Sequence, residues 1–532
     1  MIYPQFTTES FWNFSEACDL VGARYPAIPL GLITVAALLP KSWTVRLVNR
    51  NTEELAESDF AWADMVMTGG MLFQQSDTME IIDMCRARDL PVVVGGPDAT
   101  SSPHLYAGAN FRVLGEAEGI IGEFIAAWEQ GRREGVFEAE KFQVDVTKTP
   151  IPRFDLLKFD QYLYIGVQFS RGCPFTCEFC DIIELYGRVP RAKTHDQMLA
   201  ELEALYQLGY RGHVDFVDDN LIGNKKAIKA FLPVLESWVA QHDYPFEFTT
   251  EASLNLADDA ELLAMLKRAN FFAIFVGIES PDAETLTAAR KKQNTRRSIA
   301  DSVHKIYRAG MFVTAGFIVG FDTEKGSIAG PMIDLIEAAA IPIAMVGLMY
   351  ALPNTQLTRR LAREGRLHVG HDASPRGTGD QCTAGINFET KRPRVEVLRD
   401  YRKILDAIYS PDAFAGRLER LAAMLDCSSR RKELPEGDVR RKLSTIKMVH
   451  ELLSRLPEGR ERFWKAFTTC MSRNPDSVRA VVTQMAFFLH VGPYSRHAIR
   501  QIDRQIEDLE QGRSVTPKLL PATGPEPVAV NA

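Results

Sequence analysis

A regular alternation of strand-like and helical segments between Ile165 and Tyr350 is the strongest constraint on how this chain folds. Strand candidates, recognised as short apolar runs, are Ile165–Phe169, His213–Asp218, Phe246–Glu251, Ile274–Glu279, Phe312–Gly320 and Ile343–Tyr350. Helical candidates between them are Asp196–Leu208, Lys225–Gln241, Asp258–Arg268 and Arg297–Ala309. Six such units predict a parallel partial barrel of the (β/α)6 type, because a full barrel has eight.

Residues Leu32 to Gln130 show a second alternation of this kind. Its strand candidates are Thr44–Val48, Asp64–Thr68, Pro91–Val94 and Arg112–Leu114, with a helical stretch over Met79–Leu90. This pattern predicts a doubly wound, Rossmann-like α/β domain. Two loops after its strands, Thr68-Gly69-Gly70 and Gly95-Gly96-Pro97, lie at the carboxyl edge, where such sheets bind ligands. A planar cofactor can approach there.

A charged, proline-containing stretch from Gly131 to Arg153 interrupts the first alternation and marks a boundary. A chain of 532 residues is too long for one core. We expect a Rossmann-like domain over 1–150, a partial barrel over 151–354, a helical domain over 355–511 and a disordered tail over 512–532. Amphipathic helical segments are predicted at Arg394–Tyr409, Ala415–Leu425 and Val439–Leu456.

The net charge of −7 gives no general attraction for phosphate backbones, so a nucleic-acid partner is not expected. The most apolar stretch, Ala338–Leu352, has 15 residues and contains Pro342, so we expect no transmembrane segment. The opening residues show no signal peptide, which predicts a cytoplasmic protein. The segment between Ala415 and His450 contains nine Lys or Arg residues and five Asp or Glu residues. They form either a solvated helix face or a patch peripheral to the inner membrane face.

Three cysteines, Cys173, Cys177 and Cys180, have the spacing C-x3-C-x2-C on the loop after the first barrel strand. The other five cysteines are isolated, so a disulfide framework is not indicated. Three thiolates are one short of a structural zinc site, whereas on an iron-sulfur cubane they leave one iron open to an outside ligand. A chance grouping, or a zinc site completed by Cys382, is the alternative.

This loop, preceded by Ser170-Arg171-Gly172, resembles the radical S-adenosylmethionine (SAM) superfamily. The resemblance implies a 4Fe-4S cluster whose open iron binds the amino and carboxylate groups of SAM. It also implies that an electron donor such as flavodoxin or ferredoxin reduces the cluster, which cleaves SAM to methionine and a 5′-deoxyadenosyl radical. The implied SAM contacts are Phe179 near the adenine, Gly316, Ile318 and Gly320 of the fifth strand, and Glu251 and Glu279 at strand ends.

Acidic residues at strand ends are also common helix caps, so Glu251 and Glu279 can serve either purpose. The Asp218-Asp219-Asn220 triplet leaves the same choice. It either faces the cosubstrate or caps the next helix.

A Rossmann-like domain directly before the barrel is similar to the cobalamin-binding subclass of this superfamily. Gly95-Gly96-Pro97 and the Gly115-Glu116 loop match loops of that subclass, the first close to the nucleotide tail of the corrin. None of the ten histidines lies in a D-x-H-x-x-G motif. The resemblance therefore implies cobalamin binding without a lower histidine ligand from that motif.

Across nearly its whole length the chain resembles the group that contains hopanoid C-2 methylase, through Phe11-Trp12, Ser170–Phe175, Val217–Asn220 and Lys291–Asn294. The resemblance implies a C-methyltransferase that acts on an unactivated carbon of a small-molecule or lipid substrate, with hopanoid C-2 methylation as its specific form. Alternatives are cobalamin-dependent rearrangement or oxidative cyclisation, methylthio transfer, and a non-catalytic iron-sulfur docking module. The sequence disfavours the docking module, because that role does not require the Gly316–Gly320 strand.

Overall fold

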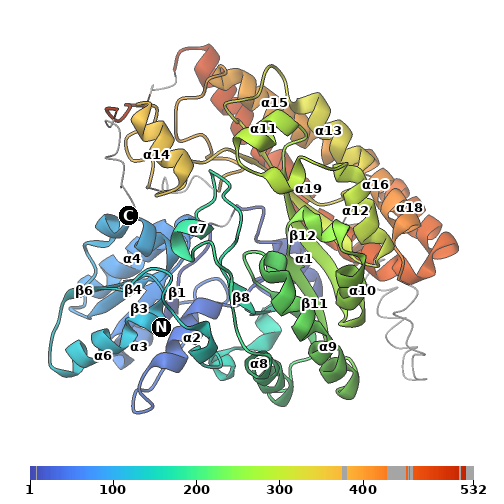
Figure 1. Ribbon diagram of the computed structural model, residues 1–532. Coiled ribbons are helices and arrows are strands. Elements are labelled where there is room, and N and C mark those ends of the chain that lie inside the picture. The colour runs from blue at the N-terminus through green and yellow to red at the C-terminus, as the bar shows by residue number, and fades with distance from the viewer. Residues whose placement is uncertain are drawn as a thin grey trace, which may run out of the picture.

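The computed structural model describes residues 1–7, 9–373, 380–427, 451–452, 454–455, 459–513 and 517–522. Two six-stranded parallel sheets lie side by side, and helices of the C-terminal region pack against the second sheet (Figure 1). The predicted fold class is confirmed: an N-terminal α/β domain, an open parallel barrel and a helical C-terminal region.

The N-terminal sheet has the strand order β2-β1-β3-β4-β5-β6. Its strands are β1 (Ile2–Tyr3), β2 (Val48–Asn49), β3 (Val66–Gly69), β4 (Val92–Gly95), β5 (Phe111–Leu114) and β6 (Gly135–Glu138). Its helices are α2 (Leu30–Leu38), α3 (Glu57–Trp62), α4 (Gln75–Arg86), α5 (Gly96–Ser101) and α6 (Ile121–Glu129). We expected a connection where β6 lies. That prediction was wrong. β6 is a short edge strand, and such a strand needs an apolar residue on only one face: Phe137 is buried, whereas Val136 is exposed.

The central sheet has the order β14-β13-β12-β11-β10-β7, and all neighbouring strands are parallel. Its strands are β7 (Ile165–Val167), β10 (Gly212–Phe216), β11 (Phe246–Glu251), β12 (Phe271–Glu279), β13 (Phe312–Val319) and β14 (Ala344–Leu348). The covering helices are α8 (His195–Gln207), α9 (Lys225–Gln241), α10 (Ala260–Arg268), α12 (Ile299–Arg308) and α13 (Ala329–Ala338). β14 is buried along its whole length, as strands covered on both faces are. Six strands with free edges at β7 and β14 confirm a partial barrel.

The C-terminal region comprises α14 (Gln356–Arg363), α15 (Arg394–Ile408), α16 (Pro411–Met424), α18 (Arg460–Arg473) and α19 (Val478–Glu510). The long helix α19 packs against α15 and against α1 (Ser15–Val21), so an N-terminal helix and a C-terminal helix are in contact (Figure 1). Most of the predicted helix Val439–Leu456 lies outside the described residues. None of the described helices has both the length and the apolar character needed to cross a membrane.

Part of the tail that we expected to be disordered is ordered. Leu519 forms an antiparallel bridge with His368, and the Leu520 N–H donates to the Leu367 carbonyl at 2.8 Å. The prediction from proline content was wrong for residues 517–522 because backbone pairing to another segment supplies the hydrogen bonds that this short stretch cannot make alone.

Candidate radical SAM site

The three cysteines lie on the loop between β8 (Ser170–Arg171) and α7 (Ile182–Leu185), which runs between the two sheets in Figure 1. Gly172 precedes the first cysteine with a φ of 95°, and a Cβ there would lie 2.9 Å from the Gly187 carbonyl oxygen. The Cys173 N–H donates to that same carbonyl at 3.2 Å. Glycine is therefore required for the turn that sets the position of the first thiol.

Two carboxylates after β10 hold this loop. Asp218 accepts hydrogen bonds from the backbone N–H groups of Phe169 and Ser170 at 2.9 and 2.6 Å, and Asp219 accepts one from the Gly172 N–H at 2.8 Å. Burial raises the pKa of Asp218 to about 7 and that of Asp219 to about 6. We expected these residues to face the cosubstrate or to cap the next helix. They instead satisfy the buried backbone donors of the cysteine loop.

Asn220, the third member of the triplet, connects the loop to the next strand. Its Nδ2 lies 3.2 Å from the Ser253 hydroxyl and 3.8 Å from the Cys173 sulfur. The side chain that caps α9 is Asn224, which accepts from the Ala227 N–H at 3.1 Å.

The surroundings of the three thiols fit an iron-sulfur cluster. Burial raises the pKa of Cys173, Cys177 and Cys180, so the free thiols are protonated at neutral pH, and metal binding is what removes these protons. Amide donors also reach two of the sulfurs: Gln293 Nε2 lies 3.9 Å from the Cys177 sulfur, and Asn220 Nδ2 lies 3.8 Å from the Cys173 sulfur. Hydrogen bonds to ligating sulfurs are a usual means of tuning such clusters.

The zinc alternative does not fit the structure. Cys382 is fully buried in the C-terminal core, where its sulfur donates to the Val346 carbonyl at 3.5 Å. Within the described ranges, no group of three or more His, Cys, Asp or Glu side chains is placed to hold a single metal ion. A structural zinc site needs four such ligands around one ion.

Glu279 at the end of β12 forms an ion pair that faces the cysteines. Its carboxylate lies 2.8 Å from the Lys291 ammonium. Burial lowers the pKa of Lys291, but Glu279 and the neighbouring Cys177 raise it more, so the ammonium stays charged. Glu279 has a φ of 70°, a conformation that costs about 1–3 kcal/mol and is found at functional sites. Glu279 is not a helix cap, since Asp282 caps the helix that follows.

A cavity of about 250 Å³ opens beside this ion pair. Four of the predicted SAM contacts line it, namely Phe179, Glu279, Gly316 and Ile318. The remaining walls are mostly apolar and are formed by Trp12, Phe73, Phe275, Gly277, Phe317, Met345, Gly347, Leu348, Met349, Tyr350, Leu352 and Gln381. Because Phe73 belongs to the N-terminal domain, the cavity lies where that domain meets the barrel.

Two predicted contacts lie outside this cavity. The Gly320 N–H donates to the Glu324 carboxylate at 2.9 Å, so its backbone serves the turn after β13. Glu251 at the end of β11 is accessible to water, but the surrounding protein and the carboxylates of Asp215 and Asp219 raise its pKa to about 8. Its contact with SAM stays a prediction.

The carboxyl edge of the N-terminal sheet is a cradle of bare backbone. A Cβ on Gly69 would overlap the Gly95 carbonyl, and one on Gly96 would lie 3.3 Å from the Gly70 nitrogen. The Thr68 hydroxyl is buried and has no hydrogen-bond partner among the described residues. Glycine at these positions therefore lets the loops after β3 and β4 pack closely against each other, and a contact with the nucleotide tail of a corrin stays a prediction. Pro97 lies in the first turn of α5, directly after this cradle.

The second predicted corrin loop has a different set of contacts. The Gly115 N–H donates to the Thr100 hydroxyl at 2.9 Å. The Glu116 carboxylate lies 3.2 Å from the Arg171 guanidinium and 2.9 Å from that of Arg191. Because Arg171 directly precedes the cysteine loop, these ion pairs fix the N-terminal domain to that loop. A contact between Glu116 and a corrin stays a prediction.

The sequence did not reveal several cavity residues. Phe73, Phe275 and Gln381 carry no local signal, because tertiary packing alone brings them to the cavity. Trp12 and Lys291 were noticed only as parts of the family resemblance, without a position in the site.

An open barrel of six parallel strands, three thiols on the loop after its first strand and a cavity beside them define the radical SAM class. The sequence model of the Radical SAM superfamily matches residues 167–336, and a model described as a domain of unknown function, DUF4070, matches residues 355–504. The chain is 42% identical to an uncharacterized methyltransferase of Synechocystis, over 96% of this chain and 94% of that protein. It is 33% identical to hopanoid C-2 methylase of Rhodopseudomonas palustris, over 94% of both chains.

Two solved structures with a similar fold contain bound cobalamin. The radical enzyme OxsB, with aqua-cobalamin and SAM bound, has a TM-score of 0.58 at 15% identity and covers 93% of this chain and 80% of its own. The methyltransferase TsrM, with cobalamin and a 4Fe-4S cluster bound, has a TM-score of 0.56 at 17% identity over 76% and 84% of the two chains. This chain belongs to the radical SAM superfamily, in the family that contains hopanoid C-2 methylase. The predicted enzyme class, with its 4Fe-4S cluster and SAM, is confirmed.

Proposed function

We propose that this protein is a cobalamin-dependent methyltransferase that methylates an unactivated carbon of an apolar substrate. The observation that carries the proposal is the cavity of about 250 Å³ at the junction of the two domains. One wall holds the predicted SAM contacts Phe179, Gly316 and Ile318. Another holds Phe73, which follows the strand β3 that contributes Thr68 and Gly69 to the glycine cradle. A substrate there would reach both cofactors.

The support for cobalamin comes from two sources. The glycine backbone of β3 and β4 lies at the carboxyl edge, where sheets of this kind bind ligands, and the Thr68 hydroxyl there has no hydrogen-bond partner among the described residues. The fold is shared with OxsB and TsrM, whose structures contain cobalamin. The named relatives, both methyltransferases, support methyl transfer over rearrangement or oxidative cyclisation.

The cofactors, when bound, supply an electron for SAM cleavage and a methyl carrier. The chain contributes placement: Cys173, Cys177 and Cys180 would bind the cluster, and Lys291, paired with Glu279, places an ammonium group beside it. The aromatic walls exclude water, which protects a radical from side reactions. The surrounding protein and neighbouring carboxylates raise the pKa of Glu251 to about 8, which favours its neutral form.

For the substrate we propose a polycyclic triterpenoid of the hopanoid type, methylated at a ring carbon. The relative named hopanoid C-2 methylase and the apolar cavity walls support this class. Small-molecule sites usually measure about 300–1,000 Å³, so a cavity of about 250 Å³ admits the reacting end and leaves the remainder outside. We further propose a flavodoxin or ferredoxin as electron donor and peripheral contact with the inner membrane face, where such a lipid resides.

Anaerobic reconstitution tests the proposal. The cluster-loaded protein is incubated with cobalamin, a reductant, SAM that carries a deuterated methyl group, and a hopanoid extract. Mass spectrometry should show one deuterated methyl on a hopanoid. A rearranged or cyclised product without the label contradicts methyl transfer. The label on another lipid contradicts the hopanoid assignment alone.

A further inference from the structure

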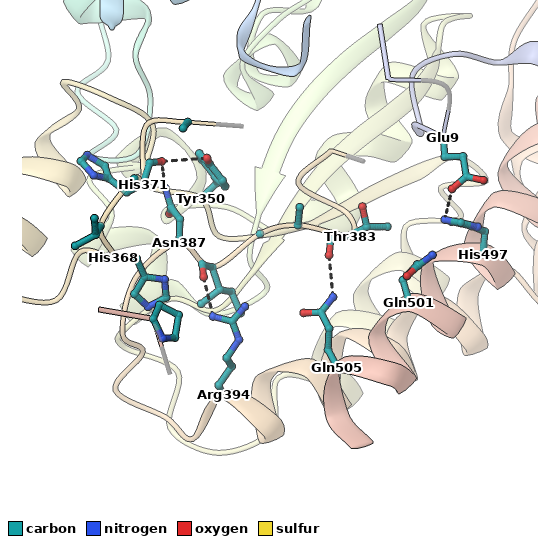
Figure 2. Close-up of a pocket in the computed structure, with 17 residues that line it drawn as sticks. Glu9, Tyr350, His368, His371, Thr383, Asn387, Arg394, His497, Gln501 and Gln505 are labelled. Atoms are coloured by element: carbon teal, nitrogen blue, oxygen red, sulfur yellow. Dashed lines mark hydrogen bonds and ion pairs between the residues drawn. The ribbon is translucent and has the colours of Figure 1, made fainter. Parts of the chain in front are cut away.

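A second cavity, of about 510 Å³, lies in the C-terminal part of the molecule, and nothing in the radical SAM site uses it (Figure 2). Residues 368–373 and 383–387 form one side, and α19 forms another. Of the residues that line the two cavities, only Tyr350 is shared. The volume is typical of a site for a small organic molecule.

Arg394 brings a positive charge into this cavity. Its NH1 donates to the Ile386 carbonyl at 2.8 Å, and among the described residues no carboxylate lies within 4 Å of its guanidinium. Burial lowers the pKa of Arg394, although Glu389 partly offsets this. A half-buried guanidinium without an ion-pair partner is unusual, because charged groups that are removed from water are normally paired.

His368 lies beside this guanidinium, as Figure 2 shows. The residue is 9% exposed, and its ring forms no hydrogen bond with the described part of the chain. Burial and the charge of Arg394 lower the pKa of His368 to about 4. His371, also in the cavity wall, has a buried Nδ1 without a partner among the described residues. Buried polar groups are normally satisfied, so the His371 Nδ1 is a candidate contact for a ligand.

The acidic side of the cavity lies away from Arg394, as Figure 2 shows. Glu9 is the carboxylate among the described lining residues, and it lies 2.7 Å from His497 at the opposite end in Figure 2. Gln501 and Gln505 line the wall between the two ends. The cavity therefore combines one unpaired cationic end with a polar wall that can bind hydroxyl groups.

We propose that this cavity binds an organic anion, with its carboxylate or phosphate on Arg394 and His368 and its polar remainder along Gln501 and Gln505. Arginine binds such groups with two parallel hydrogen bonds, which fits a guanidinium that has one NH committed to a carbonyl and the others free of a carboxylate. The ligand is either a free phosphorylated or carboxylated metabolite, or the charged end of a longer amphiphile that passes Tyr350 into the apolar cavity. The anion site does not depend on the methyl-transfer proposal.

Calorimetry on the full-length, cluster-loaded protein tests this site, with pyrophosphate and with butyl, octyl and dodecyl phosphate as probes. Arg394→Gln should weaken binding about tenfold or more, since a charge-assisted contact is lost. His368→Asn should weaken it less. Arg399→Gln is the matched control, because Arg399 lies on the same helix but is exposed and paired with Glu510. It should leave the affinity unchanged.

The chain-length series separates the two sources of the anion. If the affinity rises with alkyl length, and Met345→Trp in the apolar cavity removes that rise, the anion is the charged end of an amphiphile. An affinity that is independent of length identifies a free anion. The proposal is overturned if no probe binds saturably, or if Arg394→Gln and His368→Asn, both shown to be folded by circular dichroism, bind as tightly as the parent.

Discussion

The two parallel sheets have the same number of strands but carry opposite chemistry at their carboxyl edges. The barrel edge holds Asp218, Asp219, Glu251 and Glu279 around the thiols, whereas the N-terminal edge presents glycine backbone at β3 and β4. Titratable side chains can position a metal cluster and balance its charge. Bare backbone lets a large ligand approach closely. The comparison teaches that one kind of sheet edge can suit two kinds of cofactor through the charge and size of its side chains.

The two edges also reduce the stability of the folded protein in different ways. Burial raises the pKa of Asp218 to about 7 and that of Asp219 to about 6, and the surrounding protein and neighbouring carboxylates raise that of Glu251 to about 8. Each group is therefore destabilising when ionised. Groups with such shifts are concentrated at functional sites. The N-terminal edge instead loses stability through the conformational freedom of its glycines in the unfolded chain.

The largest expected effect is on the thiols of the barrel edge. Replacing Cys173, Cys177 or Cys180 with Ala should abolish the cluster absorbance and reduce 5′-deoxyadenosine release about 1,000-fold or more, because the cluster needs all three ligands. Cys470→Ala, in the helical region, should retain both signals. Parental release from any cluster variant would refute the assignment of these ligands.

The next prediction concerns the glycine edge. Gly69→Ala should reduce cobalamin retention about tenfold or more, since its Cβ overlaps the Gly95 carbonyl and displaces the cradle. Gly122→Ala in α6 is the control, because a Cβ there meets nothing within 4 Å. Cobalamin absorbance after gel filtration measures the difference. Equal retention of cobalamin by both variants would show that the corrin binds elsewhere and that the N-terminal edge is not a cofactor site.

The sequence predicted the barrel better than the N-terminal domain. β11 and α9 have the predicted bounds, because long apolar runs and a strong helical pattern define them locally. β2 begins at Val48 rather than Thr44, and β6 was missed, since short edge strands need little apolar sequence. The cysteines were found from spacing alone. Phe73 and Gln381 could not be found, because only the docking of distant segments makes them neighbours.

A smaller effect is expected where the two edges meet. Phe73→Ala should lower the yield of methylated product about tenfold while 5′-deoxyadenosine release persists, since Phe73 lines the cavity from the N-terminal side. Trp62→Ala removes an exposed aromatic of the same domain and should change neither. Quantifying both products in one reaction checks this. A proportional loss of both would place Phe73 in folding or in SAM binding instead.

The smallest predicted effect is a pH-dependent gain in stability from Glu251→Gln. The folded-state pKa of Glu251, about 8, lies above its ordinary value of 4.5, so the folded protein holds this proton more tightly than the unfolded chain. The contribution of the parent carboxyl is fully present below pH 4.5 and is lost as the pH rises through 8. Glutamine does not ionise, so the variant should match the parent at pH 5 and melt about 1–3 °C higher at pH 9, a shift kept small by the water access of this side chain. Glu57→Gln is the control with a pKa shift of opposite sign, because Arg88 lowers the pKa of the exposed Glu57 carboxyl. Removing that carboxylate should not raise the melting temperature at high pH. Equal melting temperatures of parent and Glu251→Gln at pH 9 would show that the barrel edge bears no cost from this carboxylate.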